Sequence, residues 1–138
     1  MDYARALVEH PKWRWEPGMG ASWWQDAMVG WLPVVVADAD GPIVRISYED
    51  KSFMLSARDG SLSDLLPALE RPATKGWLLH MLREATGDQR AQTATRGNLF
   101  TGDIVWRCSA GSHLGVDGHA TEGEALAAAL LAVWGQAA

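Results

Sequence analysis

The sequence predicts an α+β protein in which helices pack on a single antiparallel sheet of about five strands. Two observations predict this class. Short β-branched runs separated by turn residues lie within 34–57 and 104–117, and apolar residues recur at helical spacing within 72–86 and from 122 onward. The chain has 138 residues, 48% of them hydrophobic and 21% charged, which fits one globular domain spanning 1–138.

The first expected element is a short helix over residues 3–9. Asp2 is a suitable N-cap, and the His10-Pro11 pair ends the helix because the residue before a proline avoids the helical region. Residues 12–32 follow no clear period. They contain Pro17, the glycines Gly18, Gly20 and Gly30, and five of the eight tryptophans, and we assign the segment as a whole no regular element.

Three strands are expected next, over 34–37, 43–48 and 53–57. The first two are rich in β-branched residues, and turn chemistry separates them at Asp40-Gly41-Pro42. A second turn lies near Glu49 to Ser52. These strands predict an antiparallel meander.

Two helices are expected after the meander. Ser61 and Asp64 have the spacing of a capping box ahead of Leu65 and Leu66, which predicts a first helix there. A longer helix is expected from Pro72 to about Thr86, because proline suits the first turn and Gly87 suits the residue after the last.

The last expected elements are a hairpin, 104–108 with 113–117, and a helix that begins in the capping box of residues 121–124. The helix is expected to bury Leu126, Leu130 and Trp134 against the sheet. Trp77 and Trp106 also fall on faces expected to be buried.

One group of residues has the chemistry of metal ligands. Cys108, His113, Asp117 and His119 lie within twelve residues, but their spacing lacks the tight pairs of structural zinc sites. We therefore predict no metal site and no cofactor. Cys108 is the sole cysteine, so an internal disulfide is excluded and a reducing compartment is expected.

Motifs of catalysis are missing. The chain has no G-x-S-x-G, no P-loop and no glycine-rich dinucleotide motif, and its neighbouring carboxylates lie in predicted turns. The sequence favours a non-catalytic protein and names no catalytic residue. A small metal-dependent enzyme is the last of the alternatives.

Tryptophan is the most unusual feature of the composition, with 8 in 138 residues. Five lie in the segment without a clear period: Trp13, Trp15, Trp23, Trp24 and Trp31. Trp13 and Trp15 alternate with polar residues, which predicts both indoles on one face of an extended segment. Trp23 and Trp24 are adjacent, so one of them is expected to reach a surface.

We predict a partner-binding surface within 12–31, formed by Lys12, Trp13, Arg14, Trp15, Trp23 and Trp24, because exposed tryptophan beside arginine is typical of binding hot spots. The alternative is that these indoles fill the core. Base stacking on nucleic acid also remains open. The net charge of −5 argues against broad attraction to nucleic acid or to anionic membranes.

Three stretches of the chain resemble small proteins of tailed phages and prophages: Leu7 to Met19, Pro72 to Leu79 with Leu82 to Ala85, and Thr121 to Leu130. The resemblance implies a phage or prophage accessory protein in the cytoplasm of a bacterial host, and transfers no catalytic residue. Such proteins often bind a host or phage macromolecule, and inhibitors of host defence systems, including anti-CRISPR proteins, are often this small and acidic.

The function expected from the sequence is therefore non-catalytic binding of a host or phage protein. A nucleic-acid-binding accessory protein is the first alternative. The longest apolar run, 125–134, is about half of the roughly 20 residues that a membrane-spanning helix needs, so no membrane partner is expected.

Overall fold

The computed structural model describes residues 2–97, 99–110 and 114–136. The elements are α1 (Tyr3–Glu9), β1 (Gly20–Gln25), η1 (Asp26–Met28), β2 (Gly30–Asp40), β3 (Ile43–Tyr48), β4 (Lys51–Ser56), η2 (Ser61–Asp64), β5 (Leu65–Pro67), α2 (Pro72–Thr86), β6 (Gln92–Gly97), β7 (Ile104–Ala110), β8 (Leu114–His119) and α3 (Glu122–Gln136). Helices and antiparallel strands are segregated along the chain, so the predicted α+β class is confirmed.

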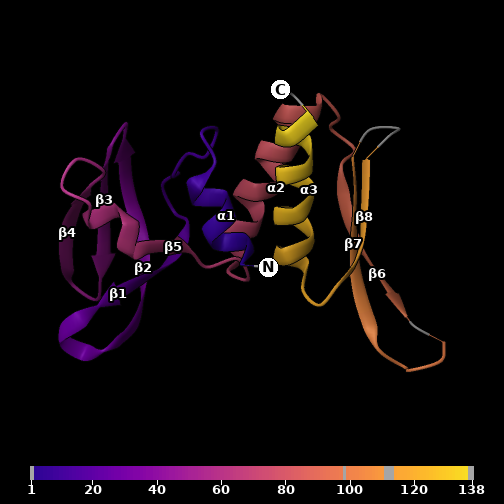
Figure 1. Ribbon diagram of the computed structural model, residues 1–138, viewed down its shortest axis with the longest axis horizontal. Coiled ribbons are helices and arrows are strands. Elements are labelled where there is room, and N and C mark those ends of the chain that lie inside the picture. Colours follow the sequence, from indigo (N-terminus) through magenta and orange to yellow (C-terminus); the bar gives the residue numbers. More distant parts are fainter. Residues whose placement is uncertain (1, 98, 111–113, 137–138) are drawn as a thin grey trace.

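The strands form two sheets at opposite ends of the molecule, with the helices between them (Figure 1). Sheet A has five antiparallel strands in the order β4-β3-β2-β1-β5, and sheet B has three in the order β6-β7-β8. The hairpin expected at 104–117 therefore lies in sheet B instead of beside the meander. Sheet A reaches five strands because β1 and β5, which the sequence did not indicate, take those places.

The predicted meander forms three neighbouring strands of sheet A, β2, β3 and β4, with β4 at the edge. A bulge between Val36 and Asp38 shifts the register of β2 against β3. On the inner side of the sheet the cross-strand neighbours are Val34, Val36, Val44, Ile46 and Leu55, all of them buried. Burial of the valines and the isoleucine among them, which are β-branched, accounts for the strong strand signal of β2 and β3.

The helix predicted over 61–66 is wrong. Residues 61–64 make one 3-10 turn, and Leu65–Pro67 continue as strand β5 beside β1. The Ser61 hydroxyl does not cap a helix. It accepts a hydrogen bond from the Ser56 amide at 2.8 Å and holds the turn against β4. Pro67 and the buried Leu65 favour the edge of a sheet over a helix interior.

The other helix boundaries agree with the sequence. Asp2 Oδ1 accepts from the Arg5 amide at 3.1 Å and caps α1. In α2, Gly87 has φ of +70°, and its N–H donates to the Arg83 carbonyl. Thr121 Oγ1 accepts from the Glu124 amide at 3.2 Å at the start of α3.

Helix α3 covers one face of sheet B. Its residues Leu126, Leu130 and Trp134 are buried as predicted, and α3 contacts α1, α2 and all three strands of sheet B. From the sheet, Cys108 and Ala110 of β7 face the helix and are buried. Trp77 and Trp106 are only half-buried and pack against the edge of the core.

A buried threonine joins sheet A to the helices. The Thr74 hydroxyl, fully buried on α2, accepts from the Gly20 amide and donates to the Gly20 carbonyl, each at 2.9 Å. This pair satisfies both backbone groups of the first residue of β1. The start of α2 is thereby fixed against the start of β1.

Candidate functional site

The two adjacent tryptophans of β1 point to opposite faces of sheet A, because neighbouring side chains alternate along a strand. Trp23 is half-buried on the inner face and packs on Phe53, with ring centroids 4.9 Å apart. Trp24 lies on the outer face opposite Trp31 of β2, and their rings meet edge-to-face at 5.4 Å. Trp23 is therefore a core residue, whereas Trp24 belongs to a surface.

The antiparallel register extends this pair into a larger apolar surface. We define the outer face of sheet A by its apolar residues Trp24, Trp31, Pro33, Val35, Ile43 and Met54; on the same face the register places Ser22, Ser47 and Arg45 opposite Pro33, Val35 and Met54. Trp31 is 45% exposed and Met54 is 63% exposed. The neighbouring turn adds Met28 and Val29, which are also exposed. Exposed apolar side chains gathered on one face of a sheet are typical of interaction sites.

Trp24 is held in place by a hydrogen bond. Its Nε1 donates to Asp26 Oδ1 at 2.7 Å, which leaves the ring exposed in part on the outer face. The 3-10 turn Asp26–Met28 and the left-handed Val29, with φ of 47°, close the hairpin between β1 and β2. The backbone of this turn therefore positions the tryptophan pair.

Trp13 and Trp15 lie in a different place. They precede β1 in an irregular segment and form a perpendicular pair with centroids 5.3 Å apart. Both line one cavity of about 740 Å³, as expected for indoles on one face; its other walls come from α1, the β2–β3 turn and the segment before η2. Both rings also pack against the core, and Trp13 Nε1 is buried without a hydrogen-bond partner in the described part of the chain.

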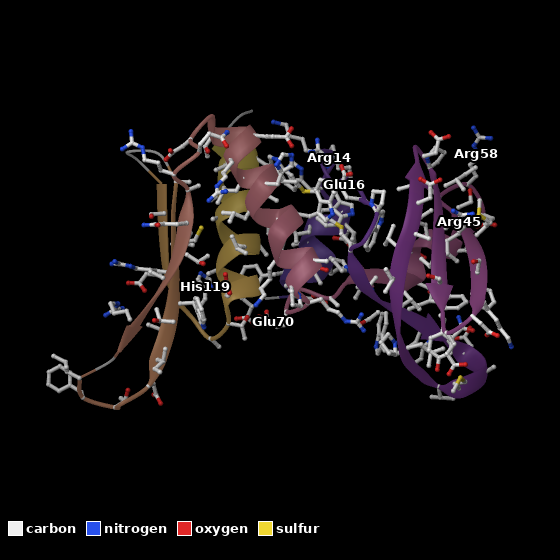
Figure 2. The ribbon with its side chains drawn as sticks, turned by 180° about the vertical axis from the view of Figure 1, so that it is seen from behind. Arg14, Glu16, Arg45, Arg58, Glu70 and His119 are labelled. Carbon is white, nitrogen blue, oxygen red and sulfur yellow. The ribbon has the colours of Figure 1, made fainter. Side chains whose placement is uncertain are left out.

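Arg14 is engaged in ion pairs, as Figure 2 shows beside Glu16. Its Nε lies 2.7 Å from Glu16 Oε1 and its Nη2 lies 2.6 Å from Glu84 Oε1, and His80 Nε2 is 2.7 Å from the same Glu84 oxygen. Partial burial lowers the pKa of Arg14, but hydrogen bonding and charge from Glu84 and Glu16 offset this and raise its pKa above the ordinary value. Lys12 is exposed and lines a smaller cavity of about 380 Å³. These two cations do not form a free basic patch.

The structure does not bring the possible metal ligands together. Cys108 faces α3 from the inner side of sheet B, whereas Asp117 lies on the outer side and pairs with Arg96 at 3.0 Å. His119 packs on Tyr3 with ring centroids 5.6 Å apart, and His113 lies outside the described residues. Across 2–97, 99–110 and 114–136, no group of three His, Cys, Asp or Glu residues is arranged to hold a metal ion.

The Cys108 thiol is an inert group at neutral pH. Burial in the interface between sheet B and α3 raises its pKa to about 11, and the charge of Glu122 adds to the shift. A thiol of this pKa is almost fully protonated at pH 7, and the thiolate is the nucleophilic form. Cys108 is therefore a small core residue.

Sequence reasoning missed most of the outer face, since it assigned residues 12–32 to no element and began the next strand at 34. The cause is the run Trp31 to Val36, in which both faces are apolar. Such a run is typical of a strand buried on both sides and carries no sign of which face is exposed. The pairing of Trp24 with Trp31 requires the turn at Asp26–Met28, which has none of the usual hairpin signals.

No family model matches the chain, and comparisons with curated proteins and with solved structures find no significant match. In the described part of the chain, no helix has the length and apolar character needed to cross a membrane.

Proposed function

We propose that this protein is a non-catalytic binding protein that docks another protein through the outer face of sheet A. Trp31 inserts into the partner as the anchor residue, and Trp24 packs against Trp31 and fixes its orientation. The observation that carries the proposal is an apolar sheet face, exposed at 40% for Val35 and Ile43 and more at Trp31 and Met54, which no helix of the described residues covers. Burial of such a face on binding gives about 25 cal/mol per Å² of apolar surface.

The composition of this face supports protein binding. Aromatic residues, Met and Arg are enriched at protein interfaces, whereas Lys, Glu and Asp are depleted. The outer face has two tryptophans and Met54, and Arg45 lies beside Met54 across the β3–β4 pair. Tryptophan contributes large contact areas with few rotatable bonds and dominates binding hot spots.

We propose that the partner is a protein of a bacterial host or of a phage, and that binding takes place in the bacterial cytoplasm. This part rests on the resemblance of the stretches around Trp13, Trp77 and Leu126 to phage and prophage accessory proteins. Inhibition of a host defence system, as in anti-CRISPR proteins, is the form of binding that we propose to test first.

Nucleic-acid binding has weaker support. Of the two cations beside Trp13 and Trp15, Arg14 is already paired with Glu16 and Glu84, which leaves Lys12 alone for a phosphate. Both indoles also pack on the core instead of offering open stacking platforms. Phosphate binding needs unpaired cations along a groove.

The test compares two surfaces of one molecule. Immobilised wild type, Trp31→Ala and a matched control, Arg107→Ala on the outer side of sheet B, are exposed to bacterial lysates with and without phage infection. A partner retained by wild type and by Arg107→Ala is then purified and its Kd measured. We expect Trp31→Ala to weaken binding about 30-fold or more.

Two results would contradict the proposal. The first is a partner that binds Trp31→Ala and wild type equally well. The second is binding of a single-stranded oligonucleotide whose affinity falls steeply between 50 and 200 mM salt, about the range where phosphate contacts weaken. A melting curve of Trp31→Ala that matches wild type shows that the fold is intact.

A further inference from the structure

Strand β4 is an open edge of sheet A. It is the last strand in the order β4-β3-β2-β1-β5, and in Figure 1 it lies at the outermost end of the sheet. The opposite edge, β5, has three residues and includes Pro67, which lacks an N–H. β4 has six residues, no proline and an unbroken register with β3. Proteins usually block a free edge with a proline, a very short strand, charged side chains or a covering loop. β4 has Lys51 at its start, and η2 covers its other end at Ser56.

The register shows which backbone groups of β4 point away from the sheet. The Ala57 amide donates to the Pro42 carbonyl at 2.9 Å, so 42 and 57 are a hydrogen-bonded pair. Hydrogen-bonded pairs alternate along an antiparallel ladder, so Phe53 and Leu55 direct their backbone groups to β3. Residues 52, 54 and 56 therefore direct theirs outward.

One of these three outward positions is occupied. Ser61 Oγ accepts from the Ser56 amide at 2.8 Å and donates to the Ser56 carbonyl at 3.3 Å. In the described part of the chain, the outward amides and carbonyls of Ser52 and Met54 have no hydrogen-bond partner. The open edge is thus the two-residue ladder of Ser52 and Met54, centred on Phe53.

We infer that two copies of this chain pair through β4, antiparallel and about a two-fold axis at Phe53. In this register Ser52 of each copy lies opposite Met54 of the other, and the four hydrogen bonds between them occupy every open outward group. The Met54 side chains lie diagonally across the axis on the outer face, within reach of each other. The result is a continuous ten-stranded sheet.

The charges at the ends of β4 fit this arrangement. The turn before the strand carries Glu49 and Asp50, and Arg58 follows the strand, projecting from the sheet A end of the molecule in Figure 2. None of these three has an ion pair within the described residues. Antiparallel pairing about Phe53 places the acidic turn of each copy beside Arg58 of the other. A parallel pairing would align like charges.

The first measurement is mass against concentration by sedimentation equilibrium. Because a single pair of strands buries less than about 1,200 Å², we expect a weak dimer that forms between about 10 µM and 1 mM. The mean mass should rise from 15.0 kDa toward twice that value. A mass that stays at 15.0 kDa up to about 1 mM overturns the inference.

Variants at Ser52 test the backbone pairing. Ser52→Pro removes an outward N–H that sheet A does not use, so the fold should survive while Kd rises at least about tenfold. The matched control, Ser52→Ala, keeps the N–H and should dimerise like wild type. Equal dimerisation of Ser52→Pro and wild type contradicts the pairing.

Cross-linking tests the register even if the proline variant does not fold. Copies with Ser52→Cys and copies with Met54→Cys are mixed under oxidising conditions. Opposite residues of a hydrogen-bonded pair lie about 5.5 Å apart, which suits a disulfide, whereas 52 to 52 and 54 to 54 are diagonal. We expect the mixed cross-link to form at least about ten times faster than either like pair. Equal rates for mixed and like pairs overturn the proposed register. Cys108 is buried and does not compete.

The inference does not depend on the proposed function. Trp31→Ala should bind the partner weakly but still dimerise, because Trp31 lies on β2, two strands away from the β4 edge. Failure of dimerisation therefore leaves the binding proposal intact. Failure of partner binding likewise leaves the dimer proposal intact.

Discussion

Sheet A and sheet B are both antiparallel, and each turns one face toward the helices, but their other faces have different chemistry. The outer side of sheet B is polar: Arg96 pairs with Asp117 across β7, and Arg107 lies beside them. The outer face of sheet A is apolar, with Trp31, Val35 and Met54 exposed. The polar side of sheet B is well solvated by water. The apolar face of sheet A is stabilised when another surface covers it, because burial of apolar area lowers the free energy.

The difference also shows how each sheet is held. Sheet B packs its inner face mainly on one helix, α3, whose buried alanines allow close approach, and α2 adds contacts to β7. Sheet A folds its inner face onto a mixed cluster that includes Leu7 of α1, Met19 and Leu65. The stability of sheet B should therefore depend mainly on α3, and the stability of sheet A on several smaller contacts. Four predictions test this comparison.

The largest effect is expected where sheet B meets α3. Leu126→Asp places an unpaired carboxylate in a site that is 1% exposed, at a cost of several kcal/mol out of the ~5–15 that stabilise a domain. We expect an unfolded protein by circular dichroism. The matched control is Ser109→Asp on the polar outer side, which should keep the wild-type melting curve. A folded Leu126→Asp would show that α3 does not dock as described.

The next effect separates the two faces of sheet A. Trp23→Ala removes a ring that packs on Phe53 and should cost about 3–5 kcal/mol of unfolding free energy. Trp31→Ala removes a ring that is 45% exposed and should cost less than about 1 kcal/mol. Urea unfolding of both variants gives the two values. Equal losses would mean that the outer face is as buried as the inner one.

A smaller effect is expected at the start of α3, where the helix touches the loop before α2. A Cβ at Gly123 meets the Leu69 carbonyl and the Glu70 carboxylate, whereas a Cβ at Gly135 in the same helix meets nothing. Gly123→Ala should lose about 1–3 kcal/mol through overpacking. Gly135→Ala should gain about 0.5–1 kcal/mol from lower chain entropy in the unfolded state. Thermal melts that rank the two variants in the reverse order would contradict this packing.

The smallest effect is expected at Cys108, where chemical labelling of the thiol is the measurement. Because its pKa is raised to about 11 in the folded protein, against 9.0 as the ordinary value, the folded state keeps the proton longer than the unfolded state does. This contribution to stability is complete below about pH 9 and is lost as the pH rises toward about 11. A thiol reagent at pH 7 should label Cys108 only after urea unfolds the protein. Rapid labelling of the native protein would show that sheet B and α3 open readily.

The sequence by itself determined the elements whose signals are local. The caps at Asp2, Thr121 and Gly87 and the buried stripe of α3 depend on residues within one or two turns of each other, so α1, α2 and α3 follow from the sequence. The β-branched runs of β2 and β3 are local in the same sense. The sequence left open whether Trp23 and Trp24 lie in an extended or a helical segment, and their opposite orientations follow from strand geometry only once β1 forms.

Only the tertiary structure decided where the strands go and which faces stay open. Residues 61–66 have a capping signal for a helix. Pairing of Leu65 with β1 stabilises this segment more than a short isolated helix would. The division into two sheets depends on the long-range approach of β6 to β7 and of β5 to β1, which no local spacing encodes. The exposure of Trp31 depends on what covers a sheet face, and a strand that is apolar on both sides gives no local sign of that.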